Sequence, residues 1–401
     1  MVLERLDRAI ATNEWFSRSS GTKVQHLLTH SSNHKAILIK LDGITLHQNR
    51  PFKFEQMWLR EGGCSDTVIK VWGPSSQNAN MLQIAGKIKA CGEKLSTWSL
   101  QSFGSIKLQV EKISKLLSKA EIDAVKGRLD YEKVRILRSE LNDLLDKESQ
   151  MWQQRSRALF LKCGDRNTNY FHSKASHRFR RKRISGLRDA SNLWCTEDSV
   201  IRNIVCDYYQ SLFTSSQPLD FVVILEAVKP SVSEVMNAQL LRPFLREEVE
   251  VAIKQMKPIS ALGPDSMPPL FYQSFWSLID VDICSAMLHF LNNYKIPLEI
   301  NSTNITMIPK VKSPELFKDF RPISLCNVVY KIVSKVLANR FRDVLPSIIS
   351  ENQSAFQAGR VIIDNILMAF ETLHYMKHHQ NGKSGFMALK LDMSKAYNRV
   401  E

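Results

Sequence analysis

The sequence predicts a mostly helical α+β protein. Its 401 residues suffice for two or three domains of roughly 100–200 residues each. No proline occurs between Pro74 and Pro218, which permits long helices, whereas short apolar runs near both ends of the chain are typical of strands. Hydrophobic residues make up 44% and charged residues 24%, which indicates a globular rather than a disordered chain.

The composition also excludes several classes of protein. No window approaches 18 uninterrupted apolar residues, so we expect no membrane-spanning segment and no membrane partner. The first residues, MVLERLDRAI, lack the apolar centre of a secretory signal. The 7 cysteines include no C-x-x-C pair, which argues against a disulfide framework or a zinc ribbon. We therefore expect a protein of the nucleus or cytoplasm that is not secreted.

Residues 1–45 are predicted to form a small α/β unit. The apolar runs VQHLLT and AILIKL flank the polar break HSSNHK, as expected for two strands joined by a loop. His26, His30 and His34 recur every four residues, which on a helix would indicate a metal site. The neighbouring Leu-Leu-Thr and Ser-Ser-Asn argue against a continuous helix, so we disfavour that alternative.

Residues 46–150 are predicted to form a helical connector. Within 103–150, apolar side chains recur at intervals of three and four, which is typical of an amphipathic helix or a helical hairpin. They are Ile106, Val110, Ile113, Leu117, Leu137, Leu141, Leu144 and Leu145. The charges between them, which include Lys112, Lys115 and Lys119, favour a solvated face over a specific binding helix.

Residues 151–242 are predicted to form a basic helical linker. The net charge of the whole chain is +15, which favours a polyanionic partner, and residues 151–190 hold eleven basic and two acidic side chains (11 − 2 = +9). Aromatic residues interleave with these cations, so the segment could bind phosphates and stack on unpaired bases of RNA or DNA. The alternative is a helix whose rings are buried and whose charges are only hydrated. The candidate contacts are Arg155, Arg157, Lys162, Arg166, Arg178, Arg180, Arg181, Lys182 and Arg183.

Residues 243–401 change to short helices, proline-containing loops and strands. We expect a helix over PFLREEVEVAIKQM, a loop over KPISALGPDSMPP, a helix over LFYQSFWSLI and a strand over NITMIPK. Two helices follow, over NVVYKIVSKVLANRFRDVL and IDNILMAFETLHYMKHH. The strand-like run FMALKL then leads directly to Asp392. A carboxylate at a strand end can hold a divalent metal in phosphoryl transfer, although such residues more often cap the next helix.

Several motifs of this region resemble one known family. In order they are ALGPDSMPPLFYQSFW, ITMIPKVKSPELFKDFRPISLCNVVYKIVSKVLANRF, ISENQSAFQAGRVIIDNILMAFE and LKLDMSKAYNRV. Together they closely resemble the fingers and early palm of reverse transcriptases from non-LTR (LINE-type) retrotransposons, especially those of plants. The resemblance therefore implies that residues 243–401 form the fingers and the start of the palm of a right-hand polymerase, incomplete at the palm.

The resemblance assigns roles to individual residues. It makes Asp392 the first carboxylate to bind Mg²⁺, and it places Tyr397 under the incoming sugar, where the ring would select dNTPs. Lys310 and Arg321 would approach the triphosphate, since ammonium and guanidinium groups grip phosphate oxygens. Four further residues would lie near template and primer. These are Gln353, Phe356, Gly359 and Arg360.

The beginning of the chain resembles a second enzyme of the same elements. The segments ERLDRAI and SSNHKAILI look like the last two motifs of the apurinic/apyrimidinic-type endonuclease that precedes the polymerase. The resemblance makes His34 the catalytic histidine and Asp7 the carboxylate that orients it, which is sound acid–base chemistry. Residues 1–45 would then be the C-terminal remnant of the endonuclease domain.

Departures from the family pattern lead us to expect an inactive fragment. A two-metal polymerase needs carboxylates from more than one strand, yet the sequence contains no Asp-Asp dipeptide and ends nine residues after Asp392. Asn33 and Asn398 stand where the family has Asp. Ser266 replaces a loop glycine that supplies a backbone angle serine adopts poorly. We interpret the chain as a decayed copy truncated at both ends, and the alternative is a non-enzymatic nucleic-acid-binding remnant.

Overall fold

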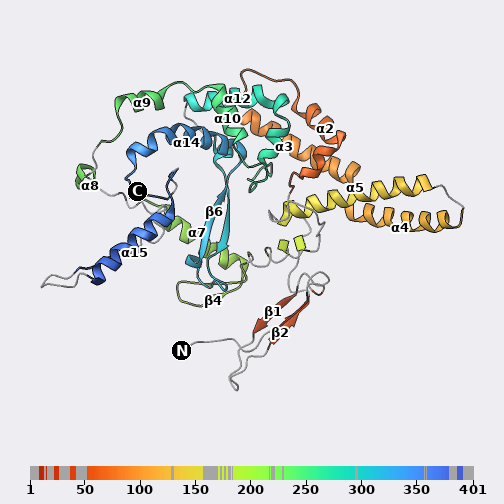
Figure 1. Ribbon diagram of the computed structural model, residues 1–401, viewed down its shortest axis with the longest axis horizontal. Helices are drawn as coiled ribbons and strands as arrows, with labels where there is room; N and C mark the ends of the chain where they lie inside the picture. The colour runs from red at the N-terminus through yellow and green to blue at the C-terminus, as the bar shows by residue number, and fades with distance from the viewer. Residues whose placement is uncertain are drawn as a thin grey trace.

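We describe the protein from a computed structural model. The residues described here are 9–12, 15, 22–26, 37–41, 52–127, 131–156, 170–171, 174–175, 178, 182, 184–215, 217, 222–227, 230–293, 297–355, 357, 359–378 and 386–391. Helices dominate these residues and the strands are short, so the predicted mostly helical α+β class is confirmed (Figure 1). No helix within these ranges is long and apolar enough to cross a membrane.

The two strands predicted near the N-terminus are present. β1 (Lys23–His26) and β2 (Ile37–Lys40) pair antiparallel, with Val24 opposite Ile39. The side chains of Val24, Leu38 and Ile39 are exposed, so the hairpin has no core of its own. Asp7 and His34 lie outside the described residues.

A helical layer follows. It comprises η1 (Gln56–Arg60), α2 (Gly62–Trp72), α3 (Met81–Trp98) and a π-helical turn, η2 (Ser99–Phe103). α3 begins at a capping box: the Asn80 side chain accepts from the Gln83 amide at 3.0 Å, and the Gln83 side chain accepts from the Asn80 amide at 2.9 Å. These bonds satisfy amides that the first turn of a helix leaves without partners.

The helical hairpin predicted within 103–150 is also present. α4 (Ile106–Val125) and α5 (Tyr131–Ser156) lie side by side and extend away from the other helices (Figure 1). Leu117, Ala120 and Ala124 of α4 pack against Val134 and its neighbours on α5, so one apolar seam holds the hairpin together. Where α5 ends, the Gln154 side chain bonds the main chain at residues 54 and 56, which fixes the hairpin to the helical layer.

A second cluster of apolar side chains gathers around a long strand pair. β5 (Asn304–Pro309) and β6 (Phe320–Leu325) pair antiparallel over their full length, and η3 (Phe317–Asp319) precedes β6. Phe317 and Phe320 pack with Leu187 and with side chains of α7 (Asp198–Phe213). A short hairpin, β3 (Leu187–Arg188) with β4 (Trp194–Cys195), adds to this cluster. α8 (Val222–Ala227) and α9 (Glu234–Leu241) follow α7.

The remaining helices are α10 (Arg246–Lys254), α11 (Pro269–Ser274), α12 (Trp276–Asn293), α13 (Leu298–Asn301), α14 (Val328–Ile348) and α15 (Ile362–His378). They include those predicted over residues 243–256, 327–345 and 363–379, whereas α13 and the second half of α12 were not predicted. The one helix predicted over 270–279 is divided into α11 and α12, because Phe275 leaves the helical conformation (φ −104°, ψ 18°). Its ring is instead buried in the core, so packing overrides the continuous helical pattern.

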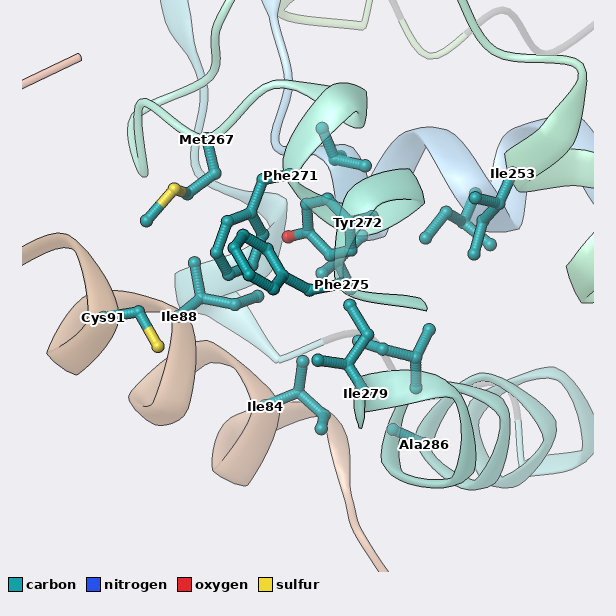
Figure 2. Close-up of a cluster of buried hydrophobic side chains, with 14 of the residues drawn as sticks. Ile84, Ile88, Cys91, Ile253, Met267, Phe271, Tyr272, Phe275, Ile279 and Ala286 are labelled. Carbon is teal, nitrogen blue, oxygen red and sulfur yellow. The ribbon is translucent and has the colours of Figure 1, made fainter. Parts of the chain in front are cut away.

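The main core joins segments that are far apart in the sequence. Figure 2 shows Ile84 and Ile88 of α3 facing Phe271 and Ile279, which come from α11 and α12. The Phe271 ring also meets the Phe54 ring edge-on, with 5.6 Å between their centroids. Residues 54–106 and 249–336 therefore share one hydrophobic core.

The strand expected over FMALKL does not form within the described residues 386–391. Phe386, Met387, Leu389 and Leu391 are all exposed there. A strand requires hydrogen-bonding neighbours, and none of the strands in the described ranges pairs with this segment. The apolar pattern alone thus does not produce a strand here.

Candidate functional site

The β5–β6 hairpin brings Lys310 and Arg321 to the same end of one structural element. Arg321 pairs with Ile308 in the ladder, and Lys310 follows β5 two residues after Ile308. The Lys310 amide donates to the Asp319 carbonyl at 2.8 Å, which closes this end of the hairpin. Both side chains are exposed. Two cations that the sequence analysis assigned to triphosphate binding therefore lie at one solvent-accessible end of the hairpin.

The acidic groups at this end are already occupied. The Asp319 carboxylate accepts from the amides of Glu315 (3.2 Å) and Leu316 (3.0 Å). Glu315 forms an ion pair with Arg188 at 2.8 Å. Because these carboxylates bond within the protein, the exposed cations of the hairpin end give it a net positive field that suits an anion such as phosphate. These exposed cations are Lys310, Lys312, Lys318 and Arg321.

Packing on the opposite face holds the hairpin in place. Met307 and Phe320 point to the side that packs against α7, because both lie on the other face of the ladder from Arg321. The Tyr209 hydroxyl of α7 lies 3.4 Å from the Met307 sulfur, and burial raises the pKa of Tyr209 to about 12. The apolar face therefore anchors the strands while the face with Arg321 stays free of this cluster.

The loop over residues 261–268 has the backbone strain that the sequence predicted. Ser266 adopts a φ of +58°, a conformation that glycine accepts freely and serine does not. Gly263 leaves no room for a side chain, because a Cβ there would lie 2.5–2.7 Å from atoms of Asn327. The Asn327 side chain accepts from the Asp265 amide at 3.2 Å, and the Lys331 ammonium donates to the Ala261 carbonyl at 2.6 Å. The loop is thus held rigidly against the start of α14.

This loop also forms one wall of a cavity of about 600 Å³ between α3 and the start of α14. Phe52, Ile88 and Val329 line the cavity together with Asp265. Burial raises the pKa of the Asp265 carboxyl to about 6, and the Met267 amide and the Lys331 charge oppose this shift only in part. The motif in the sequence includes this loop, but nothing local singles out Asp265, because its burial depends on α3, which lies far away in the sequence.

The loop between α14 and α15 is held closed by Arg360. Its guanidinium donates to the carbonyls of Ser350 (2.5 Å) and Gln353 (2.6 Å), and Gly359 provides the required positive φ of 79°. Gln353, Gly359 and Arg360 therefore lie together, as their shared motif suggested. Phe356 is outside the described residues, and no described contact tests a role for this loop beside template or primer.

The basic segment is described at only a few positions. Arg155 forms an ion pair with Glu55 at 2.8 Å and lies over the Trp152 ring, while Arg178 donates to the Ser156 carbonyl at 3.3 Å. Phe171 is 2% exposed, so its ring packs within the protein instead of presenting a face to a base. Lys182 is described as exposed only in part. The other predicted contacts are outside the described residues: Arg157, Lys162, Arg166, Arg180, Arg181 and Arg183.

No metal site is found among the described residues. Within those ranges no three His, Cys, Asp or Glu side chains gather closely enough to hold a metal ion. α12 carries two carboxylates close together, Asp280 and Asp282. Asp280 forms an ion pair with Arg246, and the Asp282 carboxylate accepts from the Trp72 indole, the Ser76 amide and the Lys87 ammonium. Neither is therefore free to ligate Mg²⁺. Asp392 and Tyr397 lie outside the described residues.

The segment that carries the hairpin cations is similar to a known protein family. Residues 308–401 match the reverse transcriptase (RNA-dependent DNA polymerase) family. The match begins within β5 and contains Lys310, Arg321, Arg360 and Asp392. This agrees with the motifs recognised in the sequence over the same residues.

Two curated proteins are similar to the chain. The first is the "Transposon TX1 uncharacterized 149 kDa protein" of Xenopus laevis, 25% identical over an alignment of 417 residues that covers 99% of this chain. The second is the "Retrovirus-related Pol polyprotein from type-1 retrotransposable element R2" of Popillia japonica, 28% identical over 160 residues that cover 40% of this chain. The chain spans 31% of the first relative and the alignment spans 21% of the second.

We predict that Ser266→Gly stabilises the protein by about 1 kcal/mol, because a left-handed conformation costs roughly that much for a residue with a Cβ. Ser266 contacts its neighbours through its main chain, which accepts from the Phe54 amide and donates to Gly263, so glycine keeps both bonds. Urea unfolding measures the change. Ser302→Gly, at a φ of −68°, is the control and is expected to give no gain. Equal effects of the two substitutions would contradict the prediction.

We also predict that Asp265→Asn stabilises the protein at pH 7.5. The folded-state pKa of about 6 lies above the ordinary 3.8, so the wild-type carboxyl favours folding when protonated and loses that stability as the pH rises from 3.8 through 6. The stability gap between variant and wild type should fall to about half by pH 5. Thermal melts across pH 5–8 measure it, with the exposed Asp143→Asn as control. A gap that does not change with pH would refute the assignment.

Proposed function

We propose that the chain is part of a non-LTR (LINE-type) retrotransposon RNA-directed DNA polymerase. It would contribute the fingers and the start of the palm, preceded by a helical connector and by the tail of an endonuclease-like domain. The observation that carries the proposal is the β5–β6 hairpin, where Lys310 and Arg321 lie exposed at one end inside the segment that matches the reverse transcriptase family.

The charge of the hairpin end supports a phosphate ligand. An ammonium supplies a point charge and a guanidinium supplies a planar fork, and both bind phosphate oxygens through charge-assisted hydrogen bonds. The Glu315 charge is offset by Arg188, and the Asp319 carboxylate accepts from two amides, so the four exposed cations outweigh the acidic groups near an incoming triphosphate. In this proposal the ligand is a dNTP, and the nucleic-acid partners are an RNA template and a DNA strand.

The metal chemistry would centre on Asp392. In polymerases of this kind, two Mg²⁺ ions stabilise the attacking and leaving oxygens of phosphoryl transfer, and their carboxylate ligands come from separate strands. The sequence supplies Asp392 but no Asp-Asp dipeptide, and Asp280 and Asp282 are engaged in other bonds. We therefore infer that these 401 residues alone do not complete the metal site. The substitutions Asn33, Ser266 and Asn398 fit a decayed copy, and the motifs most resemble those of plant elements.

A purified polypeptide of these 401 residues is expected to show no template-primed incorporation of dTTP on poly(rA)·oligo(dT) with Mg²⁺, because the second set of carboxylates is missing from its sequence. A commercial reverse transcriptase in the same mixture serves as the positive control. Incorporation by the polypeptide that Asp392→Ala abolishes would show that the site is complete.

Nucleotide binding tests the hairpin directly. The double variant Lys310→Ala/Arg321→Ala should bind dTTP at least tenfold more weakly than wild type, since each charged hydrogen bond contributes about 1.5–3 kcal/mol. Equilibrium dialysis with labelled dTTP gives the affinity. The control is Lys254→Ala/Lys257→Ala, which removes the same charge from another exposed region. If both double variants bind alike, or if wild type does not bind dTTP, the assignment of the hairpin is wrong.

A further inference from the structure

α4 carries a row of lysines on the face opposite its apolar seam. Lys112, Lys115 and Lys119 of α4 and Lys126, its C-cap residue, are all exposed and follow one another at intervals of three, four and seven residues. At 100° per residue they fall within one narrow sector of the helix, and at a rise of 1.5 Å per residue they span about 21 Å. We call these four residues the lysine row. No ion pair within the described residues engages any of them.

The acidic side chains of α4 do not cancel the row. Glu121 forms an ion pair across the hairpin with Arg138 of α5, at 2.7 Å. Asp123 is partly buried one helical turn after Lys119, and Glu111 is exposed one turn before Lys115. Even with both carboxylates counted against the four lysines, the row keeps a net charge of +2 (4 − 2). Because it lies on a hairpin that extends away from the other helices, this charge is open to a large partner (Figure 1).

We propose that the lysine row of α4 binds the phosphate backbone of a nucleic-acid duplex. A straight, rigid row of cations suits a duplex, which presents one negative charge per roughly 1.7 Å of its axis whatever its sequence. The row has no aromatic side chain, so it lacks the stacking surface that single-stranded binding relies on. The proposal rests on the nucleic-acid partner of the proposed function, and it adds a contact surface remote in sequence from residues 308–401.

The same structure argues against a membrane surface as the partner. A helix that lies in a membrane interface must bury its apolar face among lipids. In α4 that face is already buried against α5 through Leu117, Ala120 and Ala124. What remains outside is the charge, interspersed with exposed apolar side chains that spread over about half of the helix circumference and form no single stripe. These are Leu108, Leu116, Ile122 and Val125. Contact through charge alone is what a phosphate backbone offers.

The test compares duplex binding by the full chain before and after the row is neutralised. Lys112, Lys115, Lys119 and Lys126 are changed together to Gln, which keeps helix propensity close to that of Lys. Fluorescence anisotropy with an RNA–DNA duplex is measured between 50 and 300 mM salt. We expect the variant to bind at least tenfold more weakly at low salt. The slope of log affinity against log salt should fall by about 0.9 for each phosphate that the variant no longer neutralises.

A matched control removes the same charge elsewhere. Lys70, Lys94, Lys257 and Lys377 are exposed lysines scattered over four other segments, and their joint change to Gln should leave the slope near that of wild type. A gain-of-binding variant, Asp123→Asn, should tighten duplex binding, which a loss of folding could not imitate. Circular dichroism checks that all variants keep their helices.

The salt slopes and the binding of an acidic peptide together distinguish a nucleic-acid duplex from an acidic protein as the partner. Equal slopes for the row variant and the control would overturn the proposal, as would a row variant that loses binding to a poly-glutamate peptide but not to the duplex. Failure of the proposed function is distinguishable, because it would appear as unchanged dTTP binding in the Lys310→Ala/Arg321→Ala variant while the salt slope of the row variant still falls. A slope reduced only in the row variant supports the lysine row as the duplex-binding surface.

Discussion

The buried carboxylate of Asp282 is the interaction on which the arrangement of the helical layers depends. It is 0% exposed, and its oxygens accept from the Trp72 indole (2.8 Å), the Ser76 amide (2.5 Å) and the Lys87 ammonium (2.6 Å). An ionised carboxylate without partners would destabilise the core by several kcal/mol, so these bonds permit α12 to lie in only one place relative to α2 and α3. α3 also forms one wall of the cavity that Asp265 lines. The position of α3 therefore determines what faces the loop over residues 261–268.

A second charged group, Arg340, fixes the helix that follows the β5–β6 hairpin. Arg340 of α14 is 8% exposed, and its guanidinium grips Glu248 through two bonds of 2.8 Å. Its remaining donors reach the carbonyls of Leu240, Arg242 and Pro243, and its Cζ atom lies 3.5 Å from the centre of the Phe244 ring. The Arg340 hydrogen bonds hold the pKa of Glu248 below its ordinary value, so the pair stays charged. Because α14 begins three residues after β6 ends, fixing α14 also restricts where Arg321 can lie.

Properties set by local sequence were predictable, and those set by distant partners were not. The apolar spacing of three and four predicted the α4–α5 hairpin because the seam needs only these two helices. The strain at Ser266 was predictable because a backbone angle belongs to one residue and its loop. By contrast, the local sequence gives no sign that Asp282 is a buried structural carboxylate, since its partners Trp72 and Lys87 lie about 200 residues away. The break at Phe275 was missed for the same reason: the ring is drawn into a core whose other wall comes from α3.

The exposed apolar side chains of α15 also illustrate the difference between features set by local sequence and features set by distant partners. Ile362, Ile366, Phe370 and Leu373 recur at helical spacing on one face of α15, yet all of them are exposed. A face of this kind is stable only when another layer covers it, because an isolated helix of 17 residues is marginal in water. The Phe386 ring meets Tyr375 of α15 edge-on at 6.0 Å, so the run FMALKL already contacts this helix. The run can become a strand only beside another strand, because its backbone groups need hydrogen-bonding partners. The local pattern therefore specifies an apolar helix face and an apolar run, while the burial of either depends on a partner that the pattern does not specify.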